Sequence, residues 1–115
     1  MTRQVTTIYD SEDWIAPTLL NSWVNYDTGF HEQAGYYKDQ FGRVHLKGLV
    51  KDGVIDSSIP VFQLPVGYRP SGILWQSTVA SAGFGAFNVT ADGYVGIGIG
   101  SNAWVSLNFS FRASQ

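Results

Sequence analysis

Residues 41–70, FGRVHLKGLVKDGVIDSSIPVFQLPVGYRP, carry the strongest fold signal in this chain. Apolar and polar residues alternate across residues 43–51, and a second short apolar run follows at residues 59–64. A period of two is typical of a strand that buries one face and exposes the other. Pro and Gly in residues 65–70 then impose a sharp connection, because Pro restricts both its own backbone and that of the residue before it. The stretch predicts a compact all-β module.

The remainder of the chain continues with short alternating segments and tight turns. The composition includes seven Phe, six Tyr, four Trp and 13 Gly with only 14% charged residues, which favours strands joined by turns. Asp92-Gly93 is a strong hairpin signal. Strands are expected at residues 21–26, 34–38, 43–51, 59–64, 73–80, 86–90, 94–99 and 104–112. We therefore predict an all-β fold, an antiparallel β-sandwich or jelly roll of about eight short strands.

The predicted core comes mainly from the inward side of the two longest alternating segments. Residues expected to face inward are Val44, Leu46, Val50, Val105, Leu107, Phe109 and Phe111. A chain of 115 residues is long enough for one domain with one core. We expect an N-terminal arm over residues 1–13 and a β-sandwich domain over residues 14–115. Between Asp10 and Leu20 we expect at most one helical turn, because Pro17 interrupts that segment.

Composition and charge argue against several classes of protein. The net charge of −2 offers no basic surface for nucleic acid. The absence of Cys removes disulfides and thiolate zinc sites as ways to hold the fold. No run approaches the roughly 20 apolar residues of a membrane helix, and the first residues lack an apolar leader segment. We therefore expect synthesis in a cytoplasm, no nucleic-acid partner and no membrane insertion.

The chain contains no recognisable catalytic or cofactor motif. His31 and His45 lack the spacing of paired metal ligands, and no nucleophile motif occurs. Asp52 and Asp56 are the nearest approach to a carboxylate pair, but Asp followed by Gly or Ser is ordinary turn chemistry. We therefore predict that the protein is not an enzyme and uses neither a cofactor nor a metal.

Two glycines, Gly96 and Gly98, alternate with apolar residues in one predicted strand. Val95, Ile97 and Ile99 are expected to face inward, which leaves the opposite face of this strand without side chains. Such a bare face occurs where another backbone, a neighbouring subunit or a sugar ring approaches closely. A strand near a barrel corner explains the pattern equally well.

Aromatic side chains exceed what so small a core can hold. An exposed ring beside a polar group can hold a pyranose ring, but Trp and Tyr are also enriched at subunit interfaces. We expect most of the surplus rings to lie at an interface. The candidates for contact with a saccharide are Trp23, Tyr26, His45 and Trp75, each an aromatic or outward polar group on or beside a predicted strand.

Six stretches, in consistent order over roughly residues 14–112, carry a resemblance to a known family. They are NSWVNY at residues 21–26, YKD at 37–39, GRVHLKGLVK at 42–51, FQLPVGYRP at 62–70, DG at 92–93 and WVSL at 104–107. Together they resemble the head, or C-terminal, domain of bacteriophage tail fibre and receptor-binding proteins, especially those of phages that infect Gram-positive bacteria. The pattern is moderately specific for the domain and poorly specific for its ligand.

This resemblance implies a small β-sandwich or jelly roll that is usually trimeric and binds cell-surface saccharide. It implies a location on the surface of a virion, other virion proteins as partners, and a role in host attachment. Residues 1–13 show no collagen-like, coiled-coil or shaft pattern of the kind that ordinarily holds such trimers together. A structural virion protein that decorates a capsid or tail without a ligand of its own is therefore the alternative.

Overall fold

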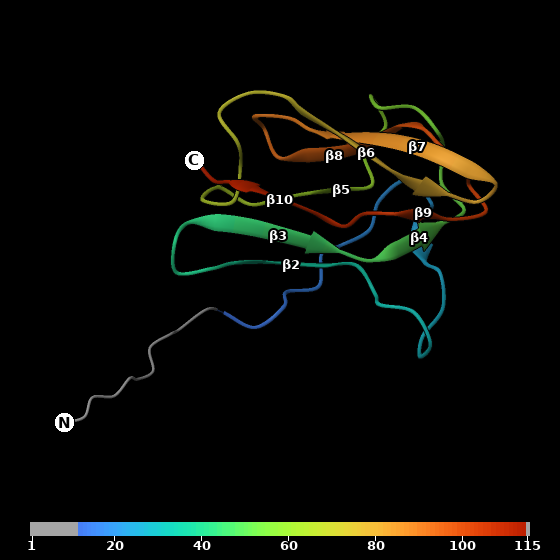
Figure 1. Ribbon diagram of the computed structural model, residues 1–115, viewed down its shortest axis with the longest axis horizontal. Coiled ribbons are helices and arrows are strands. Elements are labelled where there is room, and N and C mark those ends of the chain that lie inside the picture. The colour runs from blue at the N-terminus through green and yellow to red at the C-terminus, as the bar shows by residue number, and fades with distance from the viewer. Residues whose placement is uncertain (1–11, 115) are drawn as a thin grey trace.

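The computed structural model describes residues 12–114, and these residues form antiparallel strands and no helix (Figure 1). The strands are β1 (Val24–Asn25), β2 (Gly35–Lys38), β3 (Arg43–Lys47), β4 (Leu49–Lys51), β5 (Phe62–Gln63), β6 (Leu74–Ala80), β7 (Gly83–Val89), β8 (Tyr94–Ile99), β9 (Val105–Ser106) and β10 (Phe109–Arg112). The predicted all-β antiparallel sandwich is confirmed. Within the described range no helix is long and apolar enough to cross a membrane.

The strands form two sheets that pack face to face. The larger has seven strands in the order β1-β4-β9-β6-β7-β8-β5, and the smaller has three in the order β10-β3-β2. Figure 1 shows β6, β7 and β8 on one side of the molecule and β2 and β3 on the other. Phe87 of the larger sheet meets Phe109 of the smaller with ring centroids 5.8 Å apart, so the inner faces meet at an aromatic contact. The outer faces of the two sheets therefore point in opposite directions.

One bent ribbon links the two sheets. β3 pairs with β10 in the smaller sheet and β4 pairs with β9 in the larger, and the register is the same on both sides of the bend. The bend falls at Gly48, whose φ of 128° favours glycine, while the Leu107 N–H still donates to the Gly48 carbonyl at 2.8 Å. A Cβ at Gly48 would lie 2.5 Å from the Cα of Ala34, so the close approach also requires glycine. The single strands predicted over residues 43–51 and 104–112 are each two strands, so residues 12–114 contain ten strands where about eight were predicted.

The core lies between the two sheets, and the inward residues predicted from the alternation are in it. Val44, Leu46, Val50, Val105, Leu107 and Phe111 are buried, and Phe109 packs partly buried against them. The larger sheet and its flanking segments add Val61, Phe62, Leu64, Phe87, Val89, Val95 and Ile97. Each fully buried side chain of this size contributes roughly 1.5–3 kcal/mol to the free energy of unfolding.

A β-bulge changes the expected faces of β8. Phe87 pairs with Ile97, but the next residue along β7, Ala86, pairs with Ile99, so Gly98 is an extra residue in β8. An inserted residue reverses the alternation beyond it. Ile99 is therefore 51% exposed on the outer face, and the expectation that it faces inward was wrong.

The glycines of β8 do not form an open face. A Cβ at Gly96 would collide with the carbonyl oxygen of Ser57, and a Cβ at Gly98 would lie 3.0 Å from the Trp75 ring. The face of β8 predicted to lack side chains is therefore explained at Gly96 by close approach of the chain's own backbone. At Gly98, the chain's own Trp75 side chain occupies the space.

The described part of the segment before β1 contains no helical turn, which agrees with the expectation of at most one between residues 10 and 20. Ile15 instead forms a bridge with Tyr36 of β2, through N–H to carbonyl bonds of 2.7 and 3.0 Å. Most of the expected arm, residues 1–11, lies outside the described residues. Glu12 is described, and its carboxylate accepts the Lys38 N–H at 3.0 Å and the Tyr68 hydroxyl at 2.6 Å. The latter bond is the main reason why the pKa of Tyr68 is raised to about 12.

Candidate functional site

The outer face of the smaller sheet carries a row of polar and aromatic side chains. Residues of a strand point alternately to opposite faces, so Tyr36, Val44 and Phe111 turn inward while their neighbours turn outward. The register places Tyr37 of β2 opposite His45 of β3, and His45 opposite Ser110 of β10. Residues far apart in the sequence are thereby brought side by side on one exposed surface.

Three rings, which we call the aromatic strip, lie along this surface: Trp14, Tyr37 and His45. Tyr37 stacks on His45 with ring centroids 4.8 Å apart and an angle of 16° between the planes. Trp14 meets the other side of Tyr37 edge to face, with centroids 4.6 Å apart, and is 46% exposed. The bridge at Ile15 holds Trp14 beside β2, where its indole lies close to Gly35.

Asp39 fixes the orientation of His45. One carboxylate oxygen of Asp39 accepts the Phe41 and Arg43 N–H groups at 2.9 and 3.0 Å, which closes the turn between β2 and β3. The other lies 2.9 Å from Nε2 of His45. The hydrogen bond with His45, followed by that from the Arg43 backbone, lowers the pKa of Asp39, so this carboxylate is ionised at neutral pH. Because an ionised carboxylate only accepts, Nε2 is the donor, and Nδ1 of a neutral ring is left as an acceptor.

Charged side chains border the aromatic strip. The Lys47 ammonium lies 4.9 Å from the Trp14 ring centroid, a cation–π contact, and forms an ion pair with Glu32. Arg43 donates to the Ser110 hydroxyl at 3.1 Å. These contacts hold long side chains in place beside the rings. The surface therefore combines partly exposed rings with hydrogen-bonding groups of fixed orientation.

The chemistry available here is binding. A polyhydroxylated ring can place its C–H face on an aromatic ring and its hydroxyls on neighbouring polar groups, and the aromatic strip offers both. In residues 12–114, no group of three or more His, Asp or Glu side chains is arranged to hold a metal ion.

The structure separates the four residues predicted to contact a saccharide. His45 lies in the aromatic strip, 30% exposed in its side chain. Trp75 is 56% exposed but lies on β6, on the outer face of the other sheet. Tyr26 follows β1 and contacts His31 edge to face, with ring centroids 5.2 Å apart. Because these three lie in different regions, they do not form one site.

The prediction for Trp23 was wrong. Its side chain is only 2% exposed and belongs to the core. A Cβ at Gly53 would overlap the indole ring, so this glycine allows the backbone to lie against Trp23. A ring covered in this way has no face for a ligand.

Sequence reasoning missed Trp14 and Tyr37 as partners of His45. The signal for Tyr37 was present, because the turn between β2 and β3 sets the register that places it opposite His45. The position of Trp14 depends on the bridge between Ile15 and Tyr36, for which the sequence carries no pattern.

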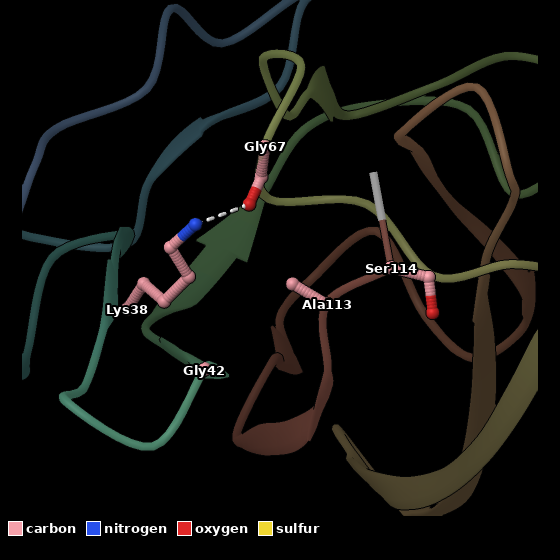
Figure 2. A pocket seen from close by; sticks show the side chains of 5 residues that line it. All are labelled: Lys38, Gly42, Gly67, Ala113 and Ser114. Carbon is pink, nitrogen blue, oxygen red and sulfur yellow. Dashed lines mark hydrogen bonds between the residues drawn. The ribbon is translucent and has the colours of Figure 1, made fainter.

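Several hollows lie outside the aromatic strip, among them the following two. The first, about 280 Å³, lies at one end of the sandwich and is lined by Lys38, Gly42, Gly67, Ala113 and Ser114, which Figure 2 shows around it. Among the described residues that line it, Lys38 alone is charged, and its ammonium is engaged: it donates to the Gly67 carbonyl at 2.7 Å and lies 5.0 Å from the Tyr68 ring centroid.

The second hollow, about 390 Å³, is lined by Ser57, Ser58, Pro60, Thr90 and Tyr94. It combines one ring with hydroxyl groups. Two of these have partners, because Ser58 donates to Asp56 at 2.7 Å and Thr90 accepts the Tyr94 N–H at 3.2 Å. The hollow therefore competes with the aromatic strip as a place for a saccharide, and variants of Tyr94 and Tyr37 distinguish the two.

Comparison of the chain with family models, with curated proteins and with solved structures finds no match.

Proposed function

We propose that this chain is a phage adhesion module that binds a saccharide of the host cell surface through the aromatic strip. The observation that carries the proposal is the row formed by Trp14, Tyr37 and His45, with His45 oriented by Asp39. The resemblance of the sequence to phage receptor-binding head domains supplies the class of ligand and the location on a virion. No catalytic step, cofactor or metal is part of the proposal.

Each site is shallow, so binding by one copy is weak. Millimolar affinity corresponds to only about −4 kcal/mol. Several identical sites on a rigid assembly raise the avidity by roughly 10²–10⁴ without any new contact. We therefore include a homotrimer in the proposal, attached to other virion proteins and displayed in many copies on the particle.

The test is binding to an array of bacterial surface saccharides and to host cells, with the wild-type chain and single variants. Tyr37→Ala and Trp14→Ala remove rings of the aromatic strip, and we expect both to reduce binding. Phe41→Ala is the matched control, because Phe41 is 77% exposed in the neighbouring turn but is not part of the strip. Binding that is abolished by Tyr94→Ala and unaffected by Tyr37→Ala would move the site to the second hollow. A chelator is expected to leave binding unchanged.

The alternative is a structural virion protein without a ligand of its own. It is favoured by an exposed apolar surface on β6, β7 and β8, since proteins that assemble into larger particles carry such surfaces. A wild-type assembly that binds no saccharide on the array and does not adhere to host cells supports this alternative.

A further inference from the structure

The outer face of β6, β7 and β8 exposes several large apolar side chains, which together we call the apolar face. Its members are Trp75, Val79, Phe84 and Ile99, with Ile73 immediately before β6, and each is more than half exposed. Val79 pairs directly with Phe84, and the bulge in β8 turns Ile99 to the same face, opposite Ala86. These are neighbours on one sheet rather than isolated apolar residues.

No charged residue occurs in β6, β7 or β8. Between Arg69 and Arg112 the only charged residue in the sequence is Asp92, which lies in the turn before β8. Depletion of charge together with enrichment of aromatic rings is the composition of an interface core. Solvated strand faces ordinarily carry Lys or Glu, which also protect against unwanted association.

The chain covers this face only in part. Ser57 lies over Gly96 at one side of it, and the Trp75 ring lies against Gly98 at 3.0–3.1 Å from a Cβ placed there. One side of Trp75 is thereby held against the sheet while the side chain stays 56% exposed. This contact restricts the ring before any partner arrives, and a restricted ring loses less conformational entropy when it is buried.

The size of the apolar face fits a protein interface. Two aromatic and three aliphatic side chains, each about half exposed, present on the order of 500–700 Å² of surface. The largest apolar patch of an ordinary monomer is about 300–600 Å², and a stable interface buries about 800 Å² per partner. The apolar face therefore lies at the upper end of what a monomer exposes, and it would supply the core of an interface whose rim is formed by neighbouring polar residues.

We infer that the apolar face is the surface through which copies of this chain associate. The occupant is another copy of this chain, because residues beside the axis of a closed trimer lie near the same residues of the other copies, and a face without charge does so without like-charge repulsion. The opposite face carries Arg43, Lys47 and Arg112, which would be brought near their own copies if that side were the interface. Association through the apolar face also leaves the aromatic strip outward on every copy. The inference rests on the proposed homotrimer and assigns its interface.

The test measures the mass of the wild-type chain and two variants by sedimentation velocity over a range of micromolar concentrations. Phe84→Glu places a charge in the apolar face, where the side chain is 63% exposed in a single copy and its loss leaves the core intact. Phe41→Glu makes the same change at a position 77% exposed outside the apolar face. We expect an oligomer for the wild type and for Phe41→Glu, and a monomer for Phe84→Glu. A far-UV spectrum equal to that of the wild type shows that Phe84→Glu is folded.

A monomeric wild type, or a Phe84→Glu variant with the mass of the wild type, overturns the inference. If Phe84→Glu does not fold, Val79→Lys, also at an exposed position of the face, replaces it with the same expectation. Saccharide binding is measured on the same samples and gives a separate outcome. Loss of the oligomer with weak binding per site retained supports both proposals, whereas an oligomer that binds no saccharide contradicts only the proposed adhesion.

Discussion

The two outer faces of the sandwich are built on the same plan but carry different chemistry. On the smaller sheet, rings alternate with charged groups, and the Asp39 carboxylate and the Lys47 ammonium contact those rings or hold them in place. On β6, β7 and β8 the outward positions hold apolar and small polar residues and no charge. Exposed aromatic rings therefore suit two different roles in this molecule, depending on their neighbours. Beside oriented polar groups a ring suits a hydrated ligand, and beside other apolar side chains it suits burial in an assembly.

The strongest test of this comparison disturbs both faces at once. Leu107 is fully buried where the ribbon passes between the sheets, so both outer faces depend on its packing. Leu107→Ala is expected to lower the free energy of unfolding by about 2–5 kcal/mol. Urea denaturation of the variant and the wild type measures the difference. A change below about 0.5 kcal/mol, the range of surface substitutions, would contradict the burial of this side chain.

Substitution at the bend tests whether the two faces are joined by one ribbon. Gly48→Ala combines a backbone conformation that side chains disfavour with a collision against Ala34, and we expect a loss of about 2–4 kcal/mol. Gly42→Ala is the control, because its φ of 85° also favours glycine but nothing lies within 4 Å of a Cβ there. The difference between the two variants in urea isolates the collision. Equal losses would show that the contact with Ala34 is unimportant.

The next test separates the two kinds of ring. Tyr37→Ala removes the central ring of the aromatic strip and is expected to weaken saccharide binding about tenfold, equivalent to about 1.4 kcal/mol. Trp75→Ala removes a more exposed ring, from the apolar face, and is expected to leave binding per site unchanged. Titration calorimetry or NMR with the best saccharide from the array measures both. The reverse result would exchange the roles of the two faces.

Low pH is expected to reduce the stability that Asp39 gives to the smaller sheet, whose outer face carries charge. Because the pKa of Asp39 is lowered in the folded protein, its bonds stabilise the fold fully above the unfolded value, about 3.9, and the contribution is lost as the pH falls through the folded pKa. We expect the melting temperature to fall below about pH 4 in the wild type. The melting temperature of Asp39→Asn is expected to decrease less than that of the wild type over the same pH range. The melting temperature of both proteins between neutral pH and about pH 2 gives the answer, and parallel curves would contradict the role of Asp39.

The smallest expected effect is that of salt on assembly. An interface without charged groups is not weakened by screening, so the oligomer should persist from low ionic strength to about 1 M. Sedimentation at the two extremes measures this. Dissociation at high salt would show that ion pairs, and not the apolar face, hold the copies together.

Much of the fold follows from local patterns in the sequence. Alternation placed Val44, Leu46 and Val105 in the core, and residues 94–99 are a strand with the predicted limits. The Asp92-Gly93 pair makes the expected turn, with Gly93 at a φ of 89°. These features depend on the side-chain period of a strand and on the backbone freedom of glycine, both of which can be read from a few neighbouring residues.

Other features arise only when distant segments meet. The sequence alone determined that this protein is an antiparallel β-sandwich, because period-two alternation and turn residues act locally. Tertiary structure decided that Trp23 is covered against Gly53, that the chain bends at Gly48 against Ala34, and that Gly98 bulges and turns Ile99 outward. It also decided which rings gather around His45 and which remain with Trp75. Contacts between residues far apart in the chain set these outcomes. The alternation within one strand shows which side chains share a face, but it does not show which other strands will lie beside that strand.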